Sequence, residues 1–120
     1  MRKPTKSSLK RRLDKICSEI VRARGKCERC GKKDSTLQCC HIFSRKFNNT
    51  RHSLDNLLCL CASCHFWSHS CPTLFTEFVF KKIGEDKYNL LKEAHNLIYK
   101  PTIEDLEIKL KVLTELTQKI

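Results

Sequence analysis

The sequence predicts an α+β, mainly α fold, in which a small ββα core lies between a basic N-terminal helix and a helical C-terminal tail. Apolar residues recur at helical spacing at both ends of the chain, whereas the middle carries two Cys-x-x-Cys pairs and two short apolar runs. The 120 residues fit a single domain, small enough to gain stability from a bound metal. We divide it into a basic helical arm (1–26), a zinc-stapled core (27–71) and a helical tail (72–120).

The arm carries ten of the 24 Lys and Arg residues against two acids, and the whole chain has a formal net charge of +11. We expect a helix from about 8 to 24 that is capped by Ser7 or Ser8 and stopped by Gly25. Such an excess of positive charge attracts polyanions and releases counterions from phosphates. The alternative, a solvated helix whose charge only maintains solubility, remains open. The apolar face of this helix consists of Leu9, Leu13, Ile16, Ile20 and Val21.

The tail predicts three helices, separated at Gly84 and at Lys100-Pro101. Thr102 caps the third helix, with Asp105 placed as in a capping box. The stripe of this helix either packs against the N-terminal helix or pairs with a second chain, so a homodimer through helical segments is one expected assembly. The stripe consists of Ile103, Leu106, Leu110, Leu113 and Ile120.

Nine cysteines indicate either a disulfide framework or a metal site. The N-terminus lacks the apolar segment of a signal peptide, and no run approaches the roughly 20 apolar residues that span a bilayer, so we expect an intracellular protein with free thiols and no membrane partner. The pairs Cys27/Cys30 and Cys61/Cys64 can surround one ion with four thiolates, the usual set for structural Zn²⁺. A redox dithiol, the alternative, would need only one pair.

Between the two cysteine pairs, apolar runs at about 37–42 and 57–60 predict two short strands joined by a long polar loop. The stretch from about 62 to 70 predicts a helix that begins inside the second cysteine pair. These elements form the expected ββα unit.

Three motifs follow one another in this unit: Cys-His-Ile-Phe-Ser-Arg around His41, Asn56 before the second strand, and Cys-x-x-Cys-His ending at His65. In this order, between two zinc knuckles, they resemble the HNH (ββα-metal) endonuclease family. The run around His41 is most similar to NinG/Rap-type recombination nucleases of phages and to endonuclease VII, which resolves branched DNA. The resemblance covers about residues 27–70.

The resemblance implies an HNH endonuclease that hydrolyses DNA phosphodiester bonds, with His41 as general base and Asn56 holding the loop that orients it. His65, and His69 one helical turn later, match ligands of one catalytic divalent ion, Mg²⁺, Mn²⁺, Ni²⁺ or Zn²⁺. Where many family members have a metal-binding Asp or His, this chain has Cys40, a poor ligand for Mg²⁺. Cys40 either does not bind metal, which we favour, or binds a softer ion, or marks a weakened site.

The expected partner is DNA, double-stranded or branched, in the cytoplasm of a bacterial host that carries a phage or prophage. Arg45, Lys46 and Arg51 flank His41 in the loop and can clamp the phosphate backbone. Arg11 and Arg12 on the arm add a second basic surface for DNA.

Two further histidines have no catalytic role in this interpretation: His52 contacts phosphate or solvent, and His95 is structural. Two other functions remain open. A non-catalytic zinc-finger protein would bind DNA through the same basic surfaces. A zinc-stabilised interaction module would bind a protein partner through the stripe of residues 103–120.

Overall fold

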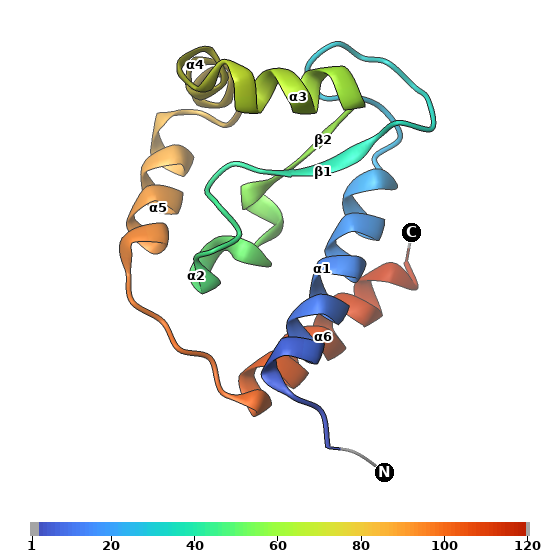
Figure 1. Ribbon diagram of the computed structural model, residues 1–120, viewed down its shortest axis with the longest axis vertical. Helices are drawn as coiled ribbons and strands as arrows, with labels where there is room; N and C mark the ends of the chain where they lie inside the picture. The colour runs from blue at the N-terminus through green and yellow to red at the C-terminus, as the bar shows by residue number, and fades with distance from the viewer. Residues whose placement is uncertain (1–2, 120) are drawn as a thin grey trace.

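The computed structural model describes residues 3–119 as a mainly helical molecule of 45 × 32 × 24 Å with one two-stranded sheet at its centre (Figure 1). A mainly helical fold with a small sheet was expected. The elements, in chain order, are α1 (Lys6–Arg22), β1 (Gln38–His41), α2 (Asn48–Arg51), a 3₁₀ turn (Leu54–Asn56), β2 (Leu57–Leu60), α3 (Ala62–Ser70), α4 (Pro72–Ile83), α5 (Glu85–Asn96) and α6 (Ile103–Thr117).

Helix α1 begins two residues earlier than the sequence predicted. Thr5, not Ser7 or Ser8, is the N-cap: its hydroxyl accepts the backbone N–H of Ser8 at 3.1 Å, and the Ser8 hydroxyl accepts the N–H of Thr5 at 3.1 Å. This reciprocal pair satisfies two N–H groups that the first helical turn leaves free. The helix ends at Arg22 with Ala23 as its C-cap, two residues before the predicted end, and Gly25 follows the turn with a φ of +84° that suits glycine.

Strands β1 and β2 are antiparallel, with Cys39 opposite Cys59 and His41 opposite Leu57. The sheet separates two apolar clusters, because alternate side chains of a strand point to opposite faces. Helix α1 packs against one face, with α6 packed on α1, and α3 packs against the other face, with α4 beside α3 (Figure 1).

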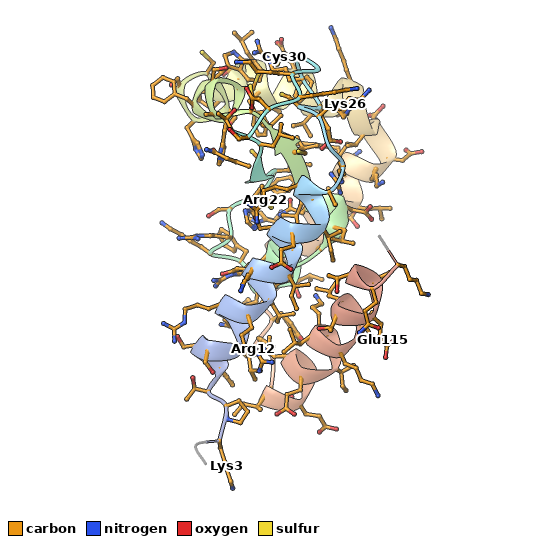
Figure 2. All side chains as sticks on the ribbon, turned by 90° about the vertical axis from the view of Figure 1, so that its right-hand side faces the viewer. Lys3, Arg12, Arg22, Lys26, Cys30 and Glu115 are labelled. Atoms are coloured by element: carbon orange, nitrogen blue, oxygen red, sulfur yellow. The ribbon has the colours of Figure 1, made fainter. Side chains whose placement is uncertain are left out.

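The cluster on the first face joins the two ends of the chain. Helices α1 and α6 lie side by side in both views (Figures 1 and 2). Leu106, Leu110 and Leu113 of the predicted stripe are therefore covered by α1, whereas Ile103 is exposed and Ile120 lies outside the described residues. The buried residues are Leu9, Leu13, Cys17 and Val21 of α1, Leu106, Leu110 and Leu113 of α6, and Leu57 and Cys59 of β2.

The tail follows the predicted three helices, but α5 ends at Asn96 and not at Lys100. The side-chain amide of Asn49 donates to the carbonyls of Ala94 and Leu97, both at 2.9 Å, and so satisfies the free end of α5. Beyond it the chain is extended as far as the Thr102 cap of α6, where Asp105 completes the predicted capping box. Among residues 3–119, no helix combines the length and the apolar character needed to cross a membrane.

Candidate active site and metal centre

The four predicted cysteines meet at one end of the molecule, where Figure 2 labels Cys30. Cys27 and Cys30 come from the turn after α1, and Cys61 and Cys64 from the start of α3; their sulfur atoms all lie within 4.8 Å of one another. A tetrahedral zinc with Zn–S bonds of ~2.3 Å has sulfur atoms ~3.8 Å apart. The Sγ atoms of Cys30 and Cys61 are 3.8 Å apart, so the cluster can hold a structural metal such as zinc.

A cationic side chain covers this cluster. The Arg29 guanidinium donates to Sγ of Cys64 at 3.5 Å and stacks 3.6 Å from the ring centroid of Trp67. Four thiolates around a divalent ion carry a net negative charge, which a guanidinium at this position offsets. Sequence reasoning did not single out Arg29, although it lies inside the first Cys-x-x-Cys pair.

The thiols of the cluster differ in acidity. The hydroxyl of Ser63 and the backbone N–H of Cys64 lower the pKa of Cys61 to about 6. Burial, together with the neighbouring thiols, raises the pKa of Cys64 to about 12. Such crowded thiols do not all ionise together, and a bound cation is what would favour four thiolates.

His41 ends β1 and is fixed by a single backbone group. Its Nε2 lies 3.0 Å from the carbonyl oxygen of Arg51. A carbonyl can only accept, so Nε2 carries the proton and Nδ1 keeps a free lone pair. Burial lowers the pKa of His41 and outweighs the hydrogen bond to the Arg51 carbonyl, which acts in the opposite direction. Because the pKa lies below its ordinary value, the ring is neutral at pH 7. A neutral imidazole with a free acceptor nitrogen is suited to removing a proton.

Asn56 is fully buried and holds the loop that leads away from His41. Its amide donates to the carbonyls of Phe43 and Thr50, both at 3.0 Å, and its oxygen accepts the N–H of Phe43 at 2.8 Å. The Asn56 side chain thus links the start of the loop, at Phe43, to its later part, at Thr50.

A cleft of about 690 Å³ lies beside β1 and brings together side chains from the loop, α3 and α4. In α3, Nδ1 of His65 donates to the Gln38 side-chain oxygen at 2.6 Å, which leaves Nε2 free. The rings of His65 and His69 are 5.1 Å apart, and burial, followed by the nearby His69 and His41, lowers the pKa of His65. The cleft is lined by five of the predicted site residues: His41, Arg45, Lys46, His65 and His69.

Cys40 does not line this cleft. Its side chain is 2% exposed, belongs to the apolar cluster on the α3 side of the sheet and lies 3.7 Å from the Ser68 hydroxyl. Burial raises the pKa of its thiol to about 11, so it is protonated at neutral pH. This geometry agrees with the interpretation that Cys40 does not bind the catalytic ion.

Arg51 and His52 are not placed as the sequence suggested. We expected Arg51 to hold phosphate and His52 to contact phosphate or solvent. Instead, the Arg51 guanidinium pairs with the Asp14 carboxylate of α1 at 2.6 Å, and the nearly buried His52 lies 2.8 Å from the same carboxylate. The loop folds back onto α1, so an acid distant in sequence neutralises Arg51. Asp14 is a residue that sequence reasoning missed.

The basic side chains of α1 divide between two places. Lys15 and Arg22 line a second hollow of about 380 Å³ that shares His41 and Arg45 with the cleft. Arg11 precedes Lys15 by one helical turn and so continues this basic stripe.

Arg12, in contrast, lines a groove between α1 and α6 with Glu107 and Glu115, and it lines neither of the two hollows that contain His41. Lys15 and Arg22 are therefore better candidates for a DNA contact than Arg12. Their i, i+7 spacing, which places both on one face of α1, was the sequence signal that could have identified them.

Comparison of the chain with models of protein families, with curated proteins and with solved structures finds no match.

Proposed function

We propose that this protein is a metal-dependent endonuclease of the HNH type that hydrolyses phosphodiester bonds of DNA. One observation carries the proposal: a neutral His41 with a free Nδ1 shares a cleft with the His65–His69 pair and with two cations, Arg45 and Lys46, that form no ion pair within residues 3–119. General base, metal ligands and phosphate-binding groups are the three components that phosphodiester hydrolysis requires.

His41 would act as the general base. Because Nε2–H is held by the Arg51 carbonyl, only Nδ1 can accept a proton, and it would take one from the water that attacks phosphorus. Asn56 would keep the loop, and with it the Arg51 carbonyl, in the position that this step needs.

His65 and His69 would hold one divalent ion through imidazole nitrogens on adjacent turns of α3. Such an ion neutralises charge on the scissile phosphate and stabilises the leaving oxygen. The cleft lining contains no carboxylate among residues 3–119, and imidazole suits Zn²⁺ or Ni²⁺ better than Mg²⁺. We therefore favour a borderline ion in this site.

We further propose that the four-cysteine cluster binds Zn²⁺ as a structural ion. It would join the turn after α1 to the start of α3, and α3 carries both cleft histidines. Binding of this ion would therefore fix α3 relative to β1 and position the two histidines.

DNA would lie across the cleft on phosphate contacts. Arg45 and Lys46 line the cleft with His41, while Lys15 and Arg22 of α1 line the adjoining hollow that also contains His41 and Arg45. Contacts of this kind fix position but read little sequence, which suits a structure-selective enzyme. Branched recombination intermediates of a phage or prophage are the substrate class we favour, because the run around His41 is similar to that of phage recombination nucleases.

The test is cleavage by the zinc-loaded protein of supercoiled plasmid, a synthetic four-way junction and single-stranded RNA, with Mg²⁺, Mn²⁺, Ni²⁺ or added Zn²⁺. We expect metal-dependent nicking of DNA that is lost in His65→Ala, with Zn²⁺ still bound to the cysteines. Faster cutting of the junction would support the recombination role. Binding without cleavage under every ion would contradict the proposal.

The lack of a carboxylate in the cleft also favours a second candidate, a non-catalytic zinc-finger protein that binds DNA through the same cations. This candidate predicts affinity that falls steeply with salt and no nicking with any ion. The same plasmid assay, combined with a filter-binding titration, distinguishes the two.

A further inference from the structure

The Asp14 carboxylate of α1 is the centre of a polar cluster that the proposed mechanism has not used. Oδ1 accepts from Nε of Arg51 at 3.0 Å and lies 2.8 Å from Nε2 of His52, while Oδ2 accepts from Nη2 of Arg51 at 2.6 Å. Burial opposes ionisation of this carboxyl, but the hydrogen bonds from Arg51 and His52 outweigh it and leave its pKa below the ordinary value. Asp14 is therefore charged and holds both partners.

The peptide group between Arg51 and His52 connects this cluster to His41. Arg51 ends α2 and His52 follows it, so the two side chains that Asp14 holds flank a single peptide group. The carbonyl of that peptide is the acceptor of His41 Nε2–H. The preceding carbonyl, of Thr50, accepts from the buried amide of Asn56. The peptide is thus fixed from α1 on one side and from Asn56 on the other.

We propose that Asp14 is a positioning residue of the active site: its two-pronged pair with Arg51 fixes the Arg51 carbonyl, and this carbonyl fixes the tautomer and orientation of His41. The basic arm is then part of the catalytic architecture as well as a surface for DNA. The Arg51 side chain serves this pair and does not bind phosphate. The expected effect of Asp14 on DNA cleavage rests on the proposed nuclease activity. Its expected effect on the hydrogen bond between His41 and the Arg51 carbonyl does not depend on that activity.

Asp14→Asn tests this inference, because it keeps the shape of the side chain and removes the charge. Glu19→Gln is the matched control, since Glu19 is an exposed acid on the same helix and forms no ion pair in the described structure. Zinc content and the thermal midpoint show that each variant is folded.

The first measurement is the imidazole NMR spectrum of His41 in the zinc-loaded full chain. Wild type and Glu19→Gln are expected to show the Nε2–H tautomer with a slowly exchanging proton. In Asp14→Asn we expect a mixture of the two tautomers and faster exchange of this proton, because the Arg51 carbonyl is no longer held in place. Arg51→Lys, which keeps a cation but loses the two-pronged geometry, should lie between them.

The second measurement is plasmid nicking. Asp14→Asn should lower kcat by about 10–100-fold and change the half-saturating DNA concentration by less than about twofold, because the lost effect is on the base and not on DNA binding. A folded Asp14→Asn protein with an unchanged His41 spectrum overturns the inference. If Asp14→Asn does not fold, an unchanged His41 spectrum in Arg51→Lys overturns it. A changed spectrum in a protein that never cuts DNA contradicts the proposed function only.

Discussion

Asn56→Ala should destabilise the protein strongly and specifically. The Asn56 side chain is fully buried and makes three hydrogen bonds, to the N–H and carbonyl of Phe43 and to the carbonyl of Thr50. Alanine would leave the N–H and the carbonyl of Phe43 without their partner, whereas the Thr50 carbonyl would keep the N–H of Ser53 at 3.2 Å. Each unsatisfied group costs about 1–3 kcal/mol, so for the two Phe43 groups we expect a total loss of about 2–5 kcal/mol.

The assay is urea unfolding of the zinc-loaded protein, followed by circular dichroism. Asn48→Ala is the matched control, because Asn48 lies in the same loop and makes one exposed hydrogen bond of 3.3 Å, to the carbonyl of Tyr99. Its loss should stay within about 0.5 kcal/mol. If Asn56→Ala lost less than about 1 kcal/mol, or no more than the control, the loop would not depend on Asn56 and our account of the site would be refuted.

Three further predictions follow from the site. The acid limb of kcat/KM for DNA cleavage should lie below pH 6.5, the ordinary value for histidine, because burial lowers the pKa of His41 and only its neutral form can accept a proton; a limb above 6.5 in a pH–rate profile would contradict this. Arg29→Ala should release zinc to a chelator about tenfold faster, measured with a metal-sensitive dye, because the thiolates lose a cationic donor. The combined change of Lys15 and Arg22 to Ala should reduce the slope of log Kd for DNA against log salt by about 2, whereas Arg12→Ala should leave it unchanged.

Local sequence signals predicted the elements and the four-cysteine cluster well. Helical spacing, capping residues and Cys-x-x-Cys pairs each act over a few residues, so the bounds of α3, the cap of α6 and the approach of the four thiols could be predicted. The position of Cys40 could also have been predicted, because strand alternation places Cys39 and His41 on one face and Cys40 on the other.

The pairing of Arg51 could not be predicted in the same way. Its partner Asp14 lies 37 residues earlier in the chain, and only the docking of the loop onto α1 brings them together. The same docking decides which basic residues of α1 lie near His41 and which lie beside α6. These facts depend on tertiary packing, to which neither spacing nor composition is sensitive.

The most direct test of the central claim is the single-turnover rate of plasmid nicking by His41→Ala, at the ion concentration that gives the highest wild-type rate. Zinc content and urea unfolding would show that the variant is folded. Our account predicts a rate lower by about 10²–10⁴-fold, because His41 would take the proton, whereas the other two histidines that line the cleft within residues 3–119, His65 and His69, would hold the ion. A His41→Ala protein that nicks DNA at the wild-type rate would contradict the account.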